Sequence, residues 1–354
     1  ERGGGGASCP MPPPLYLDSP PAMKYRVTLI KGDGIGPEVT AATCRILAAA
    51  GAPIEWEDAP GGAAAVARYG VPMPQETLDS IRRNRLGLKG PLETPKGKGF
   101  RSANVTLRQE LNLFCGYRPV RSLPGVKTPY PGVDLLVLRE NTEDLYAGIE
   151  HDLGRGTMMS LKVSTAAAGA RIARWAFEHM RNHGRRRITC CHKATVMPLA
   201  DGAFLDAFRQ IGEGYPFIAK DDVLVDNLAF QLAQDPTRFD TLLLQNLYGD
   251  ILSDLAAGLV GGLGVAPGAN IGDRVAVFEA VHGTAPDIAG QGKANPLSVL
   301  LSALLLLDYV GETRLAERIE RAVFDVLEAG AHLTGDLGGK ASTGQFTDAV
   351  IDRL

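Results

Sequence analysis

The chain has 354 residues, of which 45% are apolar and 22% are charged, and these proportions exclude a fibrous or intrinsically disordered protein. Its 37 basic and 40 acidic side chains give a net charge of −3, which argues against nucleic acid or an anionic membrane as a partner. Since a single hydrophobic core rarely grows beyond roughly 250 to 300 residues, the length favours two domains with a cleft between them.

Residues 1–22 are rich in glycine and proline and contain no continuous apolar run. We expect a disordered leader or an artificial remnant there, rather than a secretory signal peptide. The five cysteines fit neither a disulfide framework nor a CxxC zinc pattern, which indicates a reducing compartment. The longest apolar stretch, 297–307, is much shorter than the ~20 residues of a membrane-spanning helix, so no membrane partner is expected.

The predicted elements follow one another in the order typical of an α/β protein. Residues 25–30 predict a strand, and after a glycine-rich turn residues 39–50 have helical spacing. Further strands are predicted at 135–138, 188–191, 241–244 and 275–278, with helices such as 166–182 and 298–309 between them. Apolar strands separated by helices indicate a central sheet that helices cover on both faces.

Two segments interrupt this pattern. Between residues 91 and 133 the periodicity is lost and the content of Pro, Gly, Arg and Lys rises, which predicts a long functional loop or a crossing between domains. Residues 258–272 are rich in glycine, which allows the backbone to turn sharply or to approach a ligand closely.

The segment KGDGIGPE at 31–38 matches a dinucleotide-binding fingerprint only loosely. Its glycines occur at every second position, whereas a Rossmann turn requires GxGxxG and an acidic residue about 20 residues later. The spacing therefore argues against a Rossmann fold.

Two aspartates in NLYGDILSD are candidates for a metal site. Asp250 and Asp254 are four residues apart, so a helix would place both carboxylates on one face. Such a pair is either a solvated helix face or a site for Mg²⁺ or Mn²⁺, which prefer oxygen ligands. Asp226 could supply a third carboxylate.

Basic and polar residues gather between residues 101 and 146, and they fit either a polycarboxylate substrate or a solvated basic loop. The residues are Arg101, Ser102, Asn104, Arg108, Arg118, Arg121, Arg139 and Tyr146. Lys193 follows a predicted strand, where α/β proteins place catalytic groups. Lys193 and Tyr146 could act as base and acid if both face one cleft.

Several motifs of the chain occur together in a fixed order. They are KGDGIGPE (31–38), RSANVTLRQEL (101–111), RPV (118–120), RENTEDLYAGIE (139–150), HKATVM (192–197), DN (226–227), NLYGDILSD (246–254), GGLGVAPGANIG (261–272) and HGTAPDIAG (282–290). In this order they closely resemble the isocitrate and isopropylmalate dehydrogenase family of β-decarboxylating dehydrogenases, over about residues 24–354.

The resemblance implies a two-domain α/β fold in which helices flank a central sheet and which is not a Rossmann fold. The implied large domain comprises 23–113 and 261–354, the small domain 114–143 and 166–260, and a clasp at 144–165 pairs two subunits. The active site would lie between the domains and across the interface of a homodimer. A higher oligomer built on that dimer is also compatible with the family.

The resemblance also implies roles for individual residues. Substrate would be bound by Thr94, Ser102, Asn104, Arg108, Arg118 and Arg139. Tyr146 and Lys193 would be catalytic, and Asp226, Asp250 and Asp254 would hold Mg²⁺ or Mn²⁺, with Lys193 and Asp226 supplied by the partner subunit. The cofactor would be bound by His282, Gly283, Thr284, Ala285, Pro286, Asp287, Ile288 and Asn295.

The family reaction is oxidation of an alcohol by nicotinamide, followed by loss of CO2 and protonation of the enolate. The family mechanism makes Tyr146 the acid for that protonation and Lys193 the path for the hydroxyl proton. The polar pair Ser102 and Asn104 favours isocitrate, because isopropylmalate dehydrogenases present apolar residues there. Isopropylmalate, homoisocitrate or tartrate dehydrogenase, or a catalytically silent regulatory subunit, remain alternatives.

The resemblance also bears on the cofactor and on location. Asp287 favours NAD, because a carboxylate accepts hydrogen bonds from ribose hydroxyls and repels the 2′-phosphate of NADP. Thr195 departs from the Asn that is usual in the family near the nicotinamide, which implies altered turnover. The absence of a transit-peptide pattern favours a cytoplasmic enzyme, with the mitochondrial matrix as the alternative.

Overall fold

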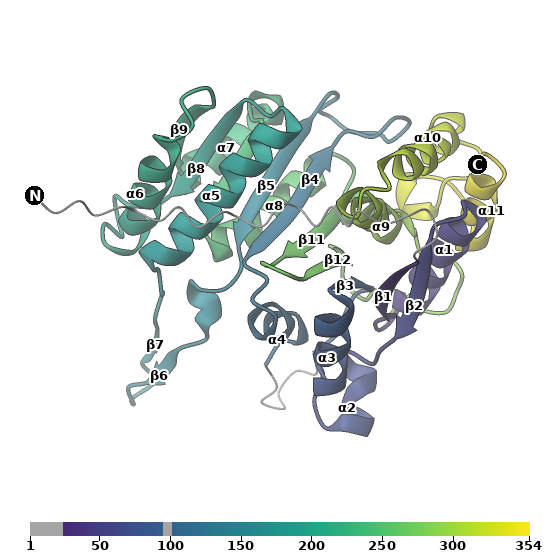
Figure 1. The fold of residues 1–354 in the computed structure, drawn as a ribbon, viewed down its shortest axis with the longest axis horizontal. Helices are drawn as coiled ribbons and strands as arrows, with labels where there is room; N and C mark the ends of the chain where they lie inside the picture. Colours follow the sequence, from purple (N-terminus) through teal and green to yellow (C-terminus); the bar gives the residue numbers. More distant parts are fainter. Residues whose placement is uncertain (1–23, 95–100) are drawn as a thin grey trace, which may run out of the picture.

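A ten-stranded mixed sheet forms the centre of the protein in a computed structural model that describes residues 24–94 and 101–354. The strands are arranged in the order β2-β1-β3-β12-β11-β4-β5-β10-β8-β9 (Figure 1). Their bounds are β1 Tyr25–Ile30, β2 Ile54–Asp58, β3 Leu86–Lys89, β4 Cys115–Arg121, β5 Asp134–Glu140, β8 Arg187–His192, β9 Ala219–Leu224, β10 Thr241–Leu244, β11 Pro267–Ile271 and β12 Ala276–Ala280.

The helices are α1 Gly36–Ala49, α2 Ala63–Tyr69, α3 Gln75–Asn84, α4 Ala103–Glu110, α5 Ala166–His183, α6 Ala200–Gly212, α7 Val225–Gln234, α8 Asn246–Leu259, α9 Leu297–Tyr309, α10 Thr313–Ala329 and α11 Thr343–Ile351. Short 3₁₀ turns lie at η1 Leu145–Ala147, η2 Pro236–Arg238, η3 Leu263–Val265 and η4 Gly335–Leu337. In the described part of the chain, none of the helices has both the length and the hydropathy needed to cross a membrane.

The strand directions distinguish this sheet from a Rossmann sheet. Neighbouring strands are parallel from β2 to β12 and again from β5 to β9, whereas β11 and β4 between these two groups pair antiparallel with their neighbours. The predicted α/β fold with a central sheet is therefore confirmed. The division into a large and a small domain stays a prediction. In the structure, β11 and β4 join the two parts in one continuous sheet.

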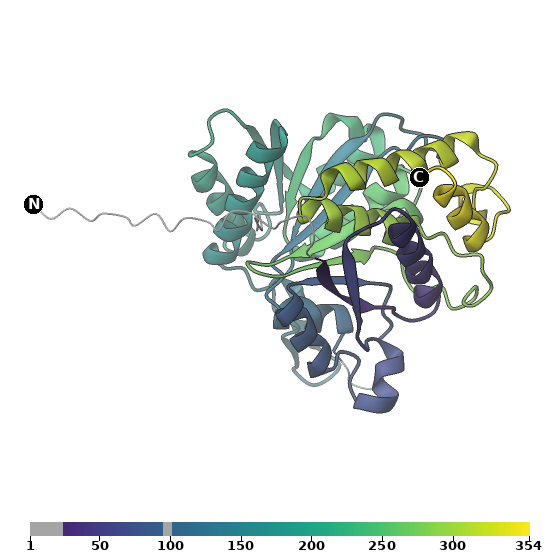
Figure 2. The same ribbon diagram turned by 45° about the vertical axis from the view of Figure 1, so that its right-hand side comes forward.

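The two faces of the sheet are covered by different helices, as the apolar strands predicted. In β5, Leu136 and Leu138 pack in the same core as α5 and α6, whereas Leu135 and Val137 pack in a second core with α7 and α8. This alternation follows from the two-residue period of a strand. On the other half of the sheet, α9 packs on β11 and β12, and α10 packs on α9 (Figure 2).

The first strand and helix form where the sequence placed them, although α1 begins three residues earlier than predicted. Pro37 lies in the first turn of α1, where its fixed φ angle suits a helix and its missing N–H needs no partner. The glycines before it allow a close approach of loops. A β-carbon at Gly34 would lie 2.0 Å from the carbonyl oxygen of Thr284, and Gly34 itself has a φ of +58°.

The segments predicted to be irregular contain regular elements. The 91–133 segment includes α4 and β4, and the glycine-rich 258–272 segment includes the end of α8 and all of β11. β4 tolerates Pro119 because β11 pairs only with Cys115 to Tyr117, so Pro119 has a sheet neighbour on the β5 side alone. The proline and glycine content of these segments argued against strands. Both residues are nevertheless tolerated at strand positions that pair with a neighbouring strand on one side only.

A small antiparallel hairpin projects from the body of the molecule. It consists of β6 (Glu150–Asp152) and β7 (Met158–Ser160) and lies within the predicted clasp at 144–165 (Figure 1). All six of its strand residues are exposed. An isolated two-stranded hairpin is only marginally stable in water, so this hairpin is suited to packing against another chain.

Candidate active site

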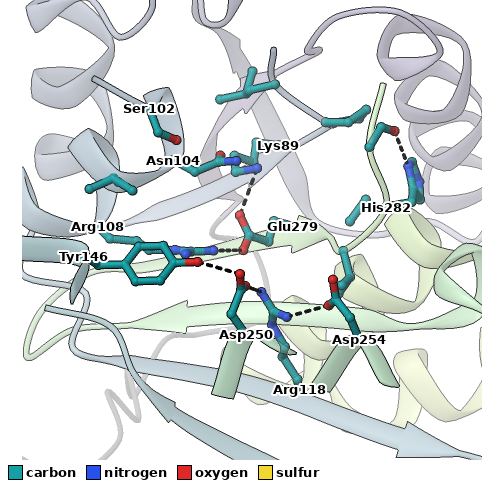
Figure 3. Close-up of a pocket in the computed structure, with 16 residues that line it drawn as sticks. Lys89, Ser102, Asn104, Arg108, Arg118, Tyr146, Asp250, Asp254, Glu279 and His282 are labelled. Atoms are coloured by element: carbon teal, nitrogen blue, oxygen red, sulfur yellow. Dashed lines mark hydrogen bonds and ion pairs between the residues drawn. The ribbon is translucent and has the colours of Figure 1, made fainter. Parts of the chain in front are cut away.

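A pocket of about 260 Å³ lies where α4, β12, η1 and α8 meet (Figure 3). Its lining includes many of the predicted site residues, namely Ser102, Asn104, Arg108, Arg118, Tyr146, Asp250, Asp254, His282 and Gly283. Lys89 and Glu279 also line it. The pocket therefore brings together charged groups of both signs from segments that are far apart in the sequence.

The start of α4 carries the predicted polar pair. Ser102 is the N-cap residue of α4, but its hydroxyl makes no capping hydrogen bond. Instead, the Thr94 hydroxyl accepts a hydrogen bond from the Ala103 amide at 3.0 Å, so Thr94 positions the helix start. The side-chain oxygen of Asn104 is buried without a hydrogen-bond partner. Ser102 and Asn104 thus leave polar groups free for a ligand.

Three predicted arginines are held in fixed directions by polar neighbours. Arg108 donates to Asn270 and to Glu279, each at 3.0 Å, and Arg118 donates to Asp254 at 3.0 Å. Arg139 is fully buried on β5 and pairs with Asp250. Burial and the neighbouring Arg108 and Arg118 lower the pKa of Arg139 to about 10. Arg139 is not among the described residues that line the pocket. It influences the pocket through its ion pair with Asp250, which does line it.

The acid pair lies on one face of α8, as its spacing predicted. Burial alone would raise the pKa of Asp250, but Arg139 and a hydrogen bond from Tyr146 hold that pKa below its usual value. The Tyr146 hydroxyl donates to Asp250 at 2.5 Å. Burial raises the pKa of Asp254. Arginines thus compensate the two like charges that the sequence alone left unexplained.

Lys89 and Glu279 are pocket residues that sequence reasoning missed. Lys89 on β3 is 1% exposed, and its ammonium lies 2.8 Å from Glu279 on β12. Despite complete burial, Lys89 and Arg108 hold the pKa of Glu279 far below its usual value. Glu279 could have been found from the sequence, because it is a charged residue inside an otherwise apolar strand. Burial of a charge is costly unless the charge is paired, so such a residue indicates a partner of opposite charge.

Lys193 and Asp226 lie outside the described lining of the pocket. Lys193 follows β8, as predicted, and its ammonium is 2.5 Å from the carboxylate of Asp226 in the first turn of α7. Among the described residues, no group of three or more His, Cys, Asp or Glu could hold a metal ion. A single chain therefore supplies Asp250 and Asp254 at one place and Asp226 at another.

The predicted cofactor segment, 282–295, is anchored to the KGDGIGPE segment. The Ile35 amide donates to the Thr284 carbonyl at 2.9 Å, and Glu38 accepts hydrogen bonds from the amides of Gly292 and Ala294. The glycines of this motif thus serve close packing of loops, which agrees with rejecting a Rossmann fingerprint.

Two side chains of this segment, those of His282 and Asp287, remain free for a ligand. His282 lines the pocket, and its buried Nε2 atom has no hydrogen-bond partner. Burial lowers the pKa of His282, which keeps the ring neutral. Asp287 is exposed. The predicted cofactor residue Asn295 is buried instead, and its side-chain amide donates to Asp336 at 2.9 Å.

Comparisons with known proteins agree with the motifs. The family model described as isocitrate/isopropylmalate dehydrogenase matches residues 26–350. The chain is 48% identical to "Isocitrate dehydrogenase [NAD] catalytic subunit 5, mitochondrial" of Arabidopsis thaliana, over 92% of this chain and 88% of that protein. It is 45% identical to a mitochondrial protein of Dictyostelium discoideum that is named as a regulatory subunit of NAD isocitrate dehydrogenase, over 93% of this chain and 92% of that protein.

The solved structures agree with the fold. The isocitrate dehydrogenase of Methylococcus capsulatus superposes with a TM-score of 0.90 at 47% identity, over 93% of this chain and 99% of that one. The names of the Arabidopsis and Dictyostelium proteins place those relatives in mitochondria, which gives no support to the expectation of a cytoplasmic enzyme. On the sequence match, the motifs and the fold together, the chain belongs to the isocitrate/isopropylmalate dehydrogenase family.

Proposed function

We propose that this chain catalyses the NAD-dependent oxidative decarboxylation of isocitrate to 2-oxoglutarate and CO2, with Mg²⁺ or Mn²⁺. The observation that carries the proposal is the pocket in which Ser102 and Asn104 face the same space as Arg108, Arg118 and the acid pair on α8. The names of relatives as subunits of NAD isocitrate dehydrogenase support it. Their mitochondrial names also support a mitochondrial location for this protein.

The substrate proposal follows from the polar lining. Arginine guanidinium groups bind carboxylates through two parallel hydrogen bonds, so Arg108 and Arg118 suit a di- or tricarboxylic acid. Ser102 and Asn104 would bind the third carboxylate of isocitrate. That carboxylate would accept hydrogen bonds from the Ser102 hydroxyl and from the side-chain NH2 of Asn104. An isopropyl group in that place would leave these donors without a partner, at a cost of about 1–3 kcal/mol.

The carboxylates of α8 fit a hard divalent cation. Asp250 and Asp254 offer oxygen donors on one helix face at the edge of the pocket. Asp226 would complete the set from a second subunit, because within one chain it pairs with Lys193 instead. When bound there, Mg²⁺ or Mn²⁺ would act as a Lewis acid that stabilises negative charge on the substrate oxygens.

Tyr146 and Lys193 would handle the protons. Burial and the hydrogen bond to Asp250 raise the pKa of Tyr146, so its hydroxyl stays protonated at neutral pH, as a proton donor to the enolate carbon must. The Arg139 guanidinium lies over the Tyr146 ring, 4.9 Å from its centre, and limits its orientation. Lys193 and Asp226 of a second subunit would form the path by which the proton leaves the substrate hydroxyl, with the Asp226 carboxylate or water as its acceptor.

The cofactor segment suits NAD. The exposed carboxylate of Asp287 can accept hydrogen bonds from both ribose hydroxyls and would repel a 2′-phosphate. The free Nε2 atom of His282 is a further polar group offered to the dinucleotide. NAD would accept the hydride from the alcohol carbon.

A catalytically silent regulatory subunit is the alternative, because a relative named as a regulatory subunit is about as similar as the catalytic ones. The residues favour catalysis. Tyr146, Lys193, Asp226, Asp250 and Asp254 are all present, and a silent subunit has no need to keep the whole set.

The test is reduction of the dinucleotide, followed by absorbance, with Mg²⁺ or Mn²⁺. Isocitrate, isopropylmalate, homoisocitrate and tartrate are each combined with NAD and with NADP. We expect turnover with isocitrate and NAD, and its loss in Tyr146→Phe, which removes only the proposed acid. Preference for another acid would contradict the assignment of Ser102 and Asn104. Absence of turnover with every pair would favour the silent subunit.

A further inference from the structure

A second cluster of buried charges lies outside the pocket and includes residues near both ends of the predicted clasp. Lys162, between β7 and α5, has a side chain that is only 12% exposed. Its ammonium lies 2.5 Å from a carboxylate oxygen of Asp201, 2.9 Å from the side-chain oxygen of Gln245 and 3.7 Å from the carboxylate of Asp144. It also lies 4.5 Å from the centre of the Tyr248 ring. One cation therefore contacts two buried carboxylates.

The first carboxylate fixes the turn that carries Tyr146. Asp144 has a φ of +73°, which is unusual for a residue other than glycine. One of its oxygens accepts a hydrogen bond from the Leu145 amide at 2.9 Å, and the other accepts one from the Leu247 amide at 2.8 Å. Leu247 lies in the first turn of α8, one helical turn before Asp250. Asp144 thus ties the Tyr146 turn to the helix of the acid pair.

The second carboxylate fixes the turn that carries Lys193. Asp201 is fully buried in the first turn of α6. The oxygen that does not meet Lys162 accepts hydrogen bonds from the Lys193 amide at 2.6 Å and from the Tyr248 hydroxyl at 3.1 Å. Asp201 therefore holds the backbone from which the Lys193 side chain reaches Asp226.

Lys162 provides the charge that makes this arrangement stable. Asp144 and Asp201 are 2% and 0% exposed, and a buried carboxylate is costly without a charged or strongly hydrogen-bonding partner. Among the described residues, Lys162 is the cation within 4.0 Å of either of them. Loss of its ammonium would leave both carboxylates uncompensated and both turns free to shift.

We infer that Lys162 is a positioning residue that holds the turn of Tyr146 and the turn of Lys193 in one rigid unit. The inference rests on the proposed function, in which Tyr146 serves the pocket of its own chain, whereas Lys193 serves the pocket of the partner subunit. In a dimer, Lys162 of one chain then positions Tyr146 in one active site and Lys193 in the other.

The first measurement is steady-state kinetics of Lys162→Met, which keeps the length of the side chain and removes its charge. We expect kcat to fall roughly tenfold to a hundredfold, because small displacements of catalytic groups are costly. The KM for isocitrate should change less than about threefold, because the arginines and the polar pair of the pocket are untouched. The exposed Lys127→Met is the control and should behave as wild type. If Lys162→Met does not fold, Lys162→Gln, which keeps one donor for Asp201, replaces it.

Mixed dimers give the sharper test. A wild-type copy and a variant copy with different affinity tags are co-expressed and purified over both tags. A wild-type/Lys193→Met dimer should keep about half of the wild-type kcat, since the variant copy damages one site. A wild-type/Asp201→Asn dimer should also keep at least about half. A wild-type/Lys162→Met dimer should fall well below half, because its variant copy disturbs both sites.

Two results would overturn the inference: an unchanged kcat in the Lys162→Met homodimer, or about half activity in its mixed dimer with wild type. Failure of the proposed function would look different. Mixing Tyr146→Phe with Lys193→Met copies should restore activity from two inactive proteins, because one site per dimer then keeps both residues. Without that recovery, the shared active site is wrong, whatever Lys162 does.

Discussion

A single buried glutamate organises the positive side of the pocket. Glu279 lies between Lys89 at 2.8 Å and Arg108 at 3.0 Å, and all three side chains are nearly inaccessible to solvent. Charges of this kind persist in a protein interior only when they are paired. The pairing fixes the direction of Arg108 before any ligand arrives, so less ordering is needed when a carboxylate binds.

Glu38 gives a residue-level prediction for cofactor binding. Its carboxylate accepts hydrogen bonds from the amides of Ala294 at 2.9 Å and Gly292 at 3.1 Å, in the segment that is proposed to hold NAD. Glu38→Gln replaces one acceptor oxygen by a donor, so one of these bonds is lost at about 1 kcal/mol. We expect the KM for NAD to rise about fivefold in steady-state assays, with kcat nearly unchanged.

The control for this variant is Glu328→Gln, which is exposed and lies far along the chain in α10. It should leave both constants at their wild-type values. If Glu38→Gln raised the KM for isocitrate as much as that for NAD, a selective role in the cofactor segment would be wrong.

At the level of elements, the packing of α5 on β4 depends on a neutral histidine. His179 on α5 stacks on Trp175 at 5.0 Å and on His183 at 3.9 Å, and it meets the edge of Tyr117 on β4 at 5.1 Å. Burial, with further contributions from His183 and Arg185, lowers the pKa of His179 to about 3. Between about pH 6.5 and pH 3 the ring is therefore uncharged in the folded protein, whereas it is protonated in the unfolded chain.

The sign of the pH effect follows from this difference. Below about pH 6.5, His179 binds a proton in the unfolded state but not in the folded state. The free energy of unfolding therefore decreases as the pH falls from about 6.5 towards 3. Between about pH 6.5 and 5.5, the free energy of unfolding should fall by about 1 kcal/mol less in His179→Phe than in the wild type. Urea unfolding at the two pH values measures it. The exposed His332→Gln is the control, and an unaltered pH dependence in His179→Phe would contradict the prediction.

Predicted and observed elements agree best where strands are continuously apolar. β10 has the predicted bounds, and β5 and β8 extend the predicted segments by one or two residues at their ends. β4 and β11 escaped prediction because proline and glycine interrupt them, and their stability comes from neighbouring strands rather than from local propensity.

At the level of the whole molecule, exposed apolar side chains concentrate in the predicted clasp. They are Leu145, Ile149, Leu153, Met158, Met159 and Leu161. Patches of this kind on a protein surface mark sites of association. The patch agrees with the prediction that the clasp pairs two copies of the chain, which the proposed active site also requires.

Met158→Asp tests this assembly. Met158 is 68% exposed in one chain, so a charge there should leave the folded protein intact and weaken an interface that buries it. We expect a smaller mass by light scattering after size-exclusion chromatography, together with loss of activity at low protein concentration and an unchanged circular dichroism spectrum. Val71→Asp, at another exposed apolar site, is the control. An unchanged mass with full activity would show that the clasp does not hold the dimer.

The sequence by itself determined the features that depend on local spacing. It placed Asp250 and Asp254 on one helix face and Lys193 at the end of a strand. It also determined the family, because the motifs occur in a fixed order and that order can be read without coordinates. These features need only the periods of helices and strands.

The tertiary structure decided which distant segments share one pocket. β3 and β12 are neighbours although most of the chain separates them, and this pairing brings Lys89 to Glu279. The same topology buries Arg139 behind Asp250 and leaves Lys193 and Asp226 away from the pocket of their own chain. Spacing along the chain does not encode these relations, because strand order in a sheet is set by packing of the whole core.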